Sequence, residues 1–239
     1  MASGGLGADG VRGQAGRATP GDTMNLLTKL ALGAMGRLRP RPALGEGAPT
    51  ITLPPPPRAG GLPLMAALAA RASAREFAPD ALPAAQLSAL LWAAWGINRE
   101  GGGRTAPSAL GAQEIDLYVA LPEGAYLYDA AAHALRLVAP ADLRGVTGYQ
   151  DFVDDAPLDL VFVADHGRMG LVPVAQRESF ASVAAGAIAQ NVYLYCASAG
   201  LATVLRAWID RGAIADALGL PHEHQVLLSQ TVGLPKATG

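Results

Sequence analysis

The spacing of apolar residues predicts two helices where the folded part of the chain begins. Residues 63–71 form a short helix, with a proline in its first turn, where a backbone N–H is not needed. Residues 83–95 form a second helix, which Gly96 ends. Its apolar stripe consists of Leu87, Leu90, Leu91 and Ala94. A polar, glycine-rich loop is expected over residues 97–103.

Further along, apolar and polar residues alternate over short segments bounded by turn residues, which is typical of β-strands. Strands are expected over residues 115–121, 125–129, 133–138, 158–164, 201–208 and 225–233. Helices are expected over residues 139–148, 176–199 and 213–218. These elements predict an α+β fold, in which helices surround a mainly antiparallel sheet.

The apolar run from Phe180 to Leu205 contains no charged side chain. It is long enough to span a bilayer as a helix. The run is, however, rich in small residues and includes the polar residues Gln190 and Asn191. We therefore favour a buried helix that forms a subunit interface, with a transmembrane span as the alternative.

Residues 1–62 have the composition of a disordered tail or linker, because Gly and Pro dominate and four prolines stand together at 54–57. The folded domain is therefore expected over residues 63–239. Within the tail, residues 24–35 resemble a signal sequence, although Lys29 interrupts their apolar core.

Charge and cysteine content limit the classes of function. The chain has 239 residues, of which 51% are hydrophobic and 16% charged, and its net charge is −2. Such a chain does not favour general binding to nucleic acid or to anionic membranes. Cys196 is the only cysteine, which excludes an intrachain disulfide framework and a multi-cysteine metal site. We expect a cytoplasmic protein, with export as the alternative if residues 24–35 are a signal.

Two arginines and a serine alternate at Arg71, Ser73 and Arg75. In an extended segment, residues two apart point the same way, so these three side chains share one side. The planar fork of arginine hydrogen-bonds a phosphate through two nitrogens and stays charged. The segment is therefore a candidate cradle for a phosphate monoester, with a solvated surface segment as the alternative.

Four short motifs follow one another along the chain. They are Arg71-Ala-Ser73-Ala-Arg75, Pro107-Ser108-Ala109, Gly200-Leu-Ala-Thr203 and Val232-Gly-Leu-Pro-Lys236. Their order and spacing resemble those of the FMN-dependent nitroreductase family, over residues 62–236. Within that family, the chain is most similar to the branch that includes the dehydrogenases acting on azoline rings in modified peptides.

The resemblance implies a nitroreductase-like fold and an intertwined homodimer, with two FMN molecules bound at the subunit interface. Arg71, Ser73 and Arg75 would hold the FMN phosphate and ribityl chain, which agrees with the anion-binding interpretation of these residues. Lys236 would approach the phosphate or the pyrimidine end of the flavin.

The resemblance also assigns residues to the isoalloxazine ring. Pro107, Ser108 and Ala109 would line the ring from the other subunit. Leu201 and Ala202 would offer backbone N–H groups near the flavin N5 and O4 atoms. Fixed donors raise the reduction potential of a flavin, because its reduced form is anionic around N1 and O2.

One position departs from the family pattern. Many members have Asn three residues after the serine, in a Pro-Ser-x-x-Asn sequence that contacts the ring, whereas this chain has Gly111. Gln113 is expected to compensate in part. Arg104 either caps the loop or, as a candidate substrate-binding residue, contacts the flavin or the substrate. Ser108 is expected to bond the backbone of a turn rather than to act as a catalytic hydroxyl.

His222 and His224 have the spacing of a metal-binding pair, but the sequence shows no third ligand beside them. The preceding proline places the pair in a loop. A solvated turn is therefore expected there, and no metal site is expected.

The resemblance implies an oxidoreductase in which the flavin carries the chemistry, so no catalytic side chain is required. Hydride would pass through flavin N5 in two half-reactions at one site. NAD(P)H would reduce a nitroaromatic or quinone acceptor through the flavin, or the flavin would oxidise a small organic substrate. The alternative is a flavin-binding dimer for storage or sensing, without significant turnover.

Overall fold

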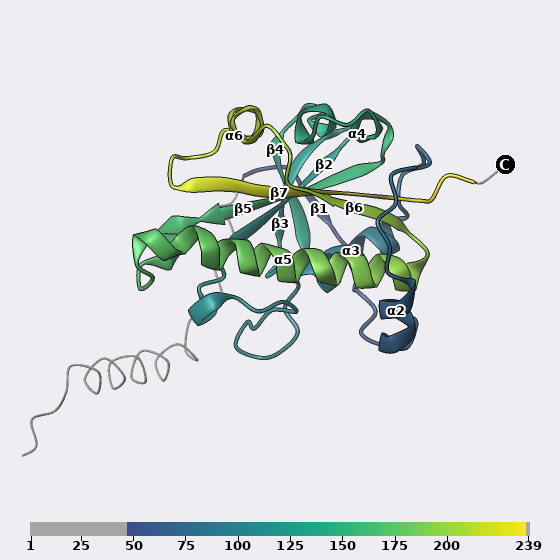
Figure 1. Cartoon of the computed structure of the whole chain (residues 1–239), viewed down its shortest axis with the longest axis horizontal. Coiled ribbons are helices and arrows are strands. Elements are labelled where there is room, and N and C mark those ends of the chain that lie inside the picture. The colour runs from purple at the N-terminus through teal and green to yellow at the C-terminus, as the bar shows by residue number, and fades with distance from the viewer. Residues whose placement is uncertain (1–46, 238–239) are drawn as a thin grey trace, which may run out of the picture. The chain divides into compact units, whose positions relative to one another are not determined.

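Seven strands form one antiparallel sheet in the computed structural model, which describes residues 47–237 (Figure 1). Their order across the sheet is β1-β4-β3-β2-β5-β7-β6, and every neighbouring pair is antiparallel. The strands are β1 (Thr50–Thr52), β2 (Ile115–Leu121), β3 (Gly124–Asp129), β4 (Ala134–Ala139), β5 (Leu158–Asp165), β6 (Ala202–Arg206) and β7 (His224–Gly233). The helices are α2 (Leu64–Ala70), α3 (Ala84–Trp95), α4 (Phe152–Asp155), α5 (Val174–Ala199) and α6 (Arg211–Leu218). Short 3-10 turns are η1 (Ala109–Gly111), η2 (Arg144–Thr147) and η3 (His166–Met169). The expected α+β fold is confirmed.

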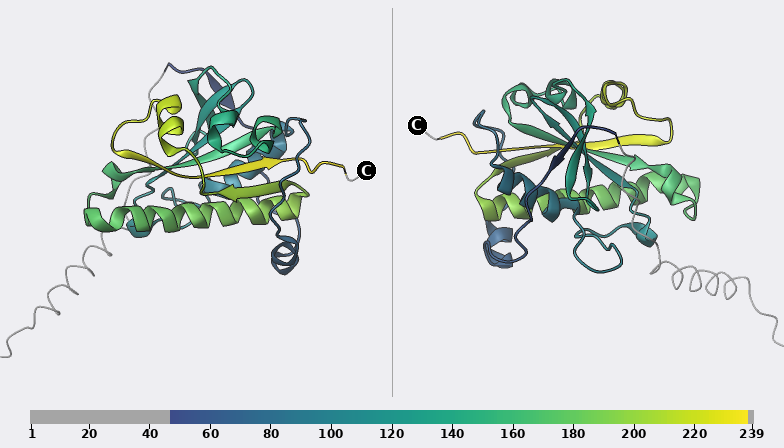
Figure 2. Two further views of the ribbon diagram at one scale, coloured as in Figure 1. Left: turned by 45° about the horizontal axis from the view of Figure 1, so that its top comes forward. Right: turned by 180° about the vertical axis from the view of Figure 1, so that it is seen from behind.

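Helices cover both faces of the sheet (Figures 1 and 2). Helices α5 and α3 lie against one face, and α6 and the short α4 lie against the other. Neighbouring residues of β5 point to opposite faces, so Leu160 and Phe162 join the core shared with α5, whereas Val161 and Val163 join the core shared with α6. Because both faces are covered, β5 is buried along nearly its whole length.

Helix α5 contains the charge-free segment noted in the sequence, and Gly200 ends it in the left-handed conformation, with φ of 69°. Among the described residues it is the one helix long and apolar enough to cross a bilayer. Here it lies along the sheet, with Ala181, Ala185, Ile188 and Val192 fully buried. The expected burial of this helix is confirmed, and a subunit interface on its opposite side stays a prediction.

The segment 139–148 does not form the expected helix. Strand β4 continues to Ala139, and only the 3-10 turn η2 follows it. The Asp142 carboxylate accepts the backbone N–H of Arg144 at 3.0 Å and pairs with the Arg144 guanidinium at 2.7 Å. These local bonds close a turn in place of a helix. Gly96 also differs from a left-handed cap, because it ends α3 in an extended conformation with φ of −71°.

The sheet begins nearer the N-terminus than the sequence predicts, because β1 lies within the expected tail and pairs with β4. The chain after β1 is bound to the domain by two hydroxyls. Ser88 Oγ donates to the carbonyl of Pro54 at 2.5 Å, and the N–H of Leu62 donates to Ser198 Oγ at 2.7 Å. The expected domain boundary therefore moves before β1. Residues 1–46, with the signal-like run, lie outside the described residues.

The N-terminal stretch lies at both edges of the sheet. Strand β1 pairs with β4, and beyond α2 the residues 71–78 run beside β6, where the N–H of Ala74 donates to the carbonyl of Thr203 at 2.9 Å. The same arrangement places the Arg71–Arg75 segment against β6.

Candidate functional site

The Arg–Ser–Arg segment, residues 71–75, is attached to both a helix and a strand through one tyrosine. The hydroxyls of Ser73 and Tyr193 are hydrogen-bonded at 2.8 Å. Tyr193 lies on α5, and its hydroxyl also accepts the N–H of Leu205 in β6 at 2.9 Å. The segment therefore has a fixed position at the edge of the sheet, although its side chains are largely exposed.

Both arginines of this segment are exposed, and neither is paired with an acidic side chain of residues 47–237. The Arg71 guanidinium lies over the ring of Tyr193, 5.3 Å from its centroid, a contact that leaves the in-plane N–H groups free. The N–H of Lys236 donates to the carbonyl of Glu76 at 3.4 Å, so the exposed Lys236 lies next to the same segment. Unpaired guanidinium forks on a fixed backbone fit the phosphate cradle expected from the sequence.

The ring loop, residues 104–114, leads into β2 and contains the motif 107–109. Its backbone enters the left-handed region at Leu110, Gly111 and Gln113, with φ of 58°, 66° and 50°. Glycine adopts this region freely, and Asn adopts it more readily than most residues. Gly111 therefore keeps a backbone conformation that suits the Asn of the family pattern, but it lacks the amide side chain.

Gln113 is held by hydrogen bonds from every one of its polar groups. Its backbone N–H donates to Ser108 Oγ at 2.7 Å, and its carbonyl accepts from Arg168 at 2.8 Å. Its side-chain oxygen accepts from Arg104 at 2.9 Å, and its side-chain nitrogen donates to the carbonyl of Gly102 at 2.9 Å. The compensating contact with the flavin ring expected of Gln113 is not supported, because its amide is used inside the protein.

Arg104 binds the ring loop to helix α3. Besides its bond to Gln113, it donates to the carbonyl of Trp95 at 2.9 Å, and its guanidinium lies 5.1 Å from the centroid of the Trp95 ring. Burial lowers the pKa of Arg104 from its ordinary value. These contacts correspond to the loop-capping alternative rather than to a substrate-binding side chain.

The Ser108 hydroxyl is also used inside the loop. It donates to Glu114 Oε2 at 2.5 Å and accepts the N–H of Gln113. Glu114 is fully buried, and its second oxygen has no hydrogen-bond partner among the described residues. Ser108 therefore bonds a turn, as expected from the sequence. Of the neighbouring motif residues, Pro107 is exposed and Ala109 is half-buried.

Leu201 does not have the free backbone donor expected of it. Its N–H donates to the carbonyl of Cys196 at 2.9 Å, in the turn that ends α5. Ala202 begins β6 opposite Gly233 of β7, and the side chains of Leu201 and Ala202 are both buried. The role proposed for Leu201 at the flavin N5 and O4 atoms is therefore corrected, because helix capping uses the donor.

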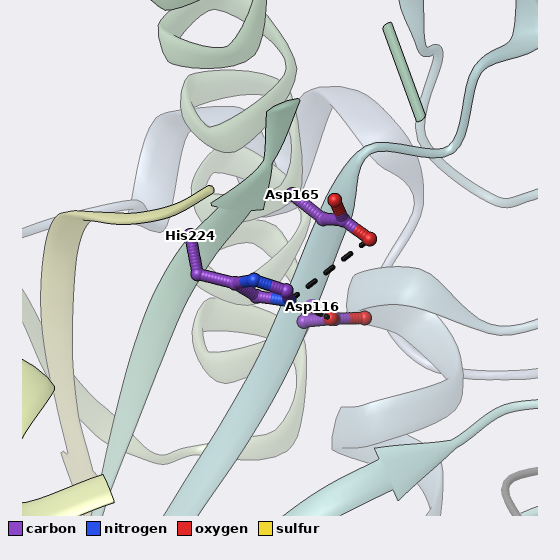
Figure 3. Close-up of side chains that lie close together, drawn as sticks. All are labelled: Asp116, Asp165 and His224. Carbon is purple, nitrogen blue, oxygen red and sulfur yellow. Dashed lines mark ion pairs between the residues drawn. The ribbon is translucent and has the colours of Figure 1, made fainter. Parts of the chain in front are cut away.

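Arg168, which follows β5, forms an ionic network with Asp116 and Asp165, two side chains that Figure 3 shows beside His224. One terminal nitrogen of its guanidinium bonds both oxygens of Asp116, at 2.9 and 2.8 Å, and Nε pairs with Asp165 at 2.8 Å. His224 Nε2 approaches these carboxylates at 3.7 and 3.9 Å. The nearer carboxylate, Asp116, raises the pKa of His224.

This network resembles a metal site only in the closeness of its ligand atoms. Atoms of Asp116, Asp165 and His224 lie within 4.8 Å of one another. The Arg168 guanidinium, however, already supplies the positive charge that both carboxylates require. His222 is exposed and does not belong to this group, so the two histidines do not form the pair that their spacing resembles.

An open groove of about 420 Å³ lies between α2, α3 and α5. It is lined by Leu62, Leu64, Ala67, Trp92, Ala93, Asn98, Thr105, Asn191, Leu194, Tyr195 and Ser198. Next to it, the apolar side chains of α2 are open to solvent, and Met65 is 75% exposed. On α5, Val183 is 72% exposed. The groove and the exposed apolar side chains of α2 beside it form a candidate binding surface.

Tyr193, Glu114 and Arg168 are the residues at this site that the sequence did not indicate. Tyr193 is a polar side chain within an apolar helix, which is a weak signal for a buried hydrogen bond. Glu114 and Arg168 are ordinary charged residues in the sequence, and only the fold brings them to the ring loop.

Known proteins resemble this chain in both sequence and structure. The model of the nitroreductase family matches residues 68–234. A nitroreductase-type protein of Methanocaldococcus jannaschii is 31% identical over 144 residues, which are 56% of this chain and 73% of that protein. A crystal structure of a nitroreductase-type protein from Ralstonia eutropha JMP134 is 55% identical, covers 84% of this chain and 96% of its own, and has a TM-score of 0.77.

A more distant structure shares the fold. The NADPH:FMN oxidoreductase of Vibrio harveyi, solved in complex with NAD+, is 20% identical, with a TM-score of 0.57 over 73% of this chain and 69% of its own. The family match spans both the Arg–Ser–Arg segment and the ring loop. The chain is therefore an oxidoreductase that belongs to the nitroreductase family.

Proposed function

We propose that the protein is an FMN-dependent oxidoreductase, which transfers hydride through flavin N5 in two half-reactions at one site. The observation that carries this proposal is the pair of exposed arginines on the fixed backbone of residues 71–75, which have no acidic partner among the side chains that the structure describes. An enzyme of this family needs a site for the FMN phosphate, and this segment supplies donors that no described acidic residue occupies.

The residues present fit the phosphate end of FMN. Arg71 and Arg75 would each donate two N–H groups to phosphate oxygens. Lys236 adds a third positive charge near the end of the segment. Ser73 is held by Tyr193, so the cradle is in place before the ligand binds.

FMN, when bound, supplies the hydride chemistry through its N5 atom. The chain contributes binding, orientation and exclusion of water. The ring loop would present Pro107 and Ala109 to the isoalloxazine ring, since the side chains of Arg104, Ser108 and Gln113 are bonded within the protein. The hydroxyl of Ser108 donates to Glu114, so we assign no proton transfer to it.

We propose that the active form is a homodimer, with the ring loop of one subunit against the flavin held by the other. The groove of about 420 Å³ and the exposed apolar side chains of α2 and α5 support this proposal. Sizing chromatography without detergent should give about twice the monomer mass of 24.4 kDa. A protein that is strictly monomeric while it holds flavin would contradict the dimer.

The proposed electron donor is NAD(P)H, and the proposed acceptors are nitroaromatic or quinone compounds. The name of the V. harveyi oxidoreductase, which includes NADPH and FMN, supports a nicotinamide donor. Oxidation of a small organic substrate, as in the azoline branch, is the second form of the same chemistry. Which form applies depends on whether an organic substrate or NAD(P)H reduces the bound flavin.

The test begins with purified protein, which should be yellow or should become yellow on addition of FMN. The flavin-loaded protein should then oxidise NADH or NADPH in the presence of a nitroaromatic or a quinone, or be reduced by an organic donor. Protein that binds no FMN would contradict the cofactor assignment.

A flavin-binding dimer for storage or sensing is the second candidate. It is favoured by one observation, since Gly111 has no side chain and the Gln113 amide is bonded to Arg104 and Gly102. Neither residue would then orient a substrate at the ring. A flavin-loaded dimer that turns over neither nicotinamide nor organic donors would support this second function and contradict the first.

A further inference from the structure

The ring loop has a backbone that is unfavourable by itself. Leu110 and Gln113 have positive φ values of 58° and 50°, a region that costs energy for any residue with a Cβ. Gly111, between them, has φ of 66° without that penalty. Strained conformations persist where the surrounding structure determines them, and they gather at functional sites. Contacts with the rest of the protein must therefore hold this loop in its conformation.

The hydrogen bonds of Gln113 supply these contacts, because their partners belong to separate parts of the fold. Ser108 belongs to the ring loop itself, and Gly102 belongs to the loop before it. Arg104 is stacked on Trp95 of α3. Arg168 follows β5, 55 residues further along the chain. Of these contacts, only the one from Arg168 connects the loop to the segment that follows β5.

Arg168 is itself fixed. Its Nε and one terminal nitrogen bond Asp165 and Asp116, which leaves the other terminal nitrogen to donate to the Gln113 carbonyl. The Arg168 side chain is 18% exposed and that of Asp116 is 5% exposed, so water competes little with these bonds. Three directions of bonding need the rigid fork of arginine, and a lysine ammonium cannot replace it.

We propose that Arg168 is a positioning residue for the flavin ring, which acts through the Gln113 carbonyl to hold residues 107–111 in the shape that meets the isoalloxazine. This inference rests on the proposed function and adds a residue to it. Arg168 does not contact the flavin or the reacting atoms in this account. Its effect would be confined to the ring end of the cofactor and would leave the phosphate end intact.

The test compares Arg168→Lys with a matched control, Arg136→Lys. Arg136 lies on β4, which β3 separates from β2, and pairs with Asp129 at 2.8 Å, with 15% and 5% exposure of the two side chains. Both substitutions keep a positive charge and remove the forked guanidinium of arginine, and the two ion pairs are similarly buried. General weakening of the fold would therefore appear in both variants.

Two readouts separate positioning from a merely structural role. The first is hydrogen exchange of the backbone amides of residues 108–113 in protein without flavin. The second is the dissociation constant for FMN and for riboflavin, which has no phosphate, from quenching of flavin fluorescence. Arg168→Lys should speed the hydrogen exchange of the loop amides. It should also weaken the binding of both flavins by the same factor, about tenfold or more, since a hydrogen bond from a charged group is lost. Arg136→Lys should change neither.

The outcomes distinguish this inference from the proposed function. If wild-type protein binds FMN, and Arg168→Lys matches it in loop exchange and in riboflavin affinity, the positioning role is wrong and the proposed function stands. If wild-type protein binds neither flavin, the proposed function fails and the positioning role fails with it.

A second variant covers the case in which Arg168→Lys does not fold. Asp165→Asn keeps Arg168 but removes the charge that pairs with its Nε at 2.8 Å, so the guanidinium is held less firmly at the Gln113 carbonyl. This variant should weaken the binding of FMN and of riboflavin by the same factor. A loss restricted to FMN would contradict the inference, because it would place the effect at the phosphate.

Discussion

The Arg–Ser–Arg segment and the ring loop contain the same kinds of side chain, but they use them in opposite ways. In residues 71–75 the arginines are exposed and have no acidic partner among the described residues. In the ring loop, Arg104 and Ser108 are bonded to Trp95, Gln113 and Glu114. Free donors are suited to binding a ligand, whereas bonded donors fix the shape of the backbone. The position of a residue in the network, and not its type, therefore decides its role.

The largest expected effect is on the segment with free donors. The double substitution Arg71→Ala and Arg75→Ala should weaken FMN binding by about a hundredfold or more, since each charge-assisted contact contributes about 1.5–3 kcal/mol. Riboflavin binding should be nearly unchanged, and thermal stability should hold because both side chains are exposed. Fluorescence titration measures both constants. Arg58→Ala, another exposed arginine, is the control, and equal losses of FMN and riboflavin would contradict the phosphate assignment.

The next effect concerns the ring loop and is one of stability. Gln113→Ala removes the acceptor of the largely buried Arg104 guanidinium and should lower the free energy of unfolding by about 2–3 kcal/mol. Gln113→Gly removes the same contacts but relieves the positive φ of 50°, so it should be about 1 kcal/mol less destabilising than Gln113→Ala. Urea unfolding tests the pair. Equal stability of the two variants would show that the loop is not strained at this residue.

Two serines give the closest test of the contrast. Ser108→Ala leaves the Gln113 N–H and the buried Glu114 without their partner, and should cost about 1–2 kcal/mol of stability. Ser73→Ala should cost less than about 1 kcal/mol, because Ser73 is exposed, and should act mainly on FMN affinity. If Ser73→Ala lowered the free energy of unfolding in urea more than Ser108→Ala did, the distinction between the two regions would be contradicted.

The smallest expected effect is the pH dependence from His224. Asp116 raises the pKa of His224 in the folded protein above its ordinary value near 6.5. The resulting stabilisation is fully present below the unfolded pKa and is lost as the pH rises through the folded pKa. It should be less than about 1 kcal/mol, because solvent screens the pair. Urea midpoints of wild type and His224→Gln should therefore differ more at pH 6 than at pH 9, and a constant difference would contradict this.

Much of the fold follows from local sequence patterns, because the buried and exposed positions of an element alternate within it. Strand β2 and helix α5 were expected close to their observed bounds for this reason. Strand β1 was missed because its three residues have no pattern of their own, and its partner β4 is far along the chain. The helix expected over 139–148 was wrong because one carboxylate, Asp142, bonds its neighbours more favourably.

In the candidate site, too, local features could be predicted from the sequence and contacts set by the fold could not. The candidate phosphate cradle could be proposed from the sequence because Arg71, Ser73 and Arg75 are close together in it. The use of the Leu201 N–H in capping α5 could not be, since capping is a property of the backbone geometry. The bond between Arg168 and Gln113 joins residues 55 positions apart, and no spacing rule indicates it.

The central claim is that residues 71–75 bind the phosphate of FMN, and comparison of FMN with riboflavin on the wild-type protein tests it most directly. With two free arginine forks at the phosphate, we expect FMN to bind at least about a hundredfold more tightly than riboflavin. Raising the salt concentration should narrow the difference, because the arginines are exposed. Equal affinities for the two flavins, or no binding of either, would contradict the account.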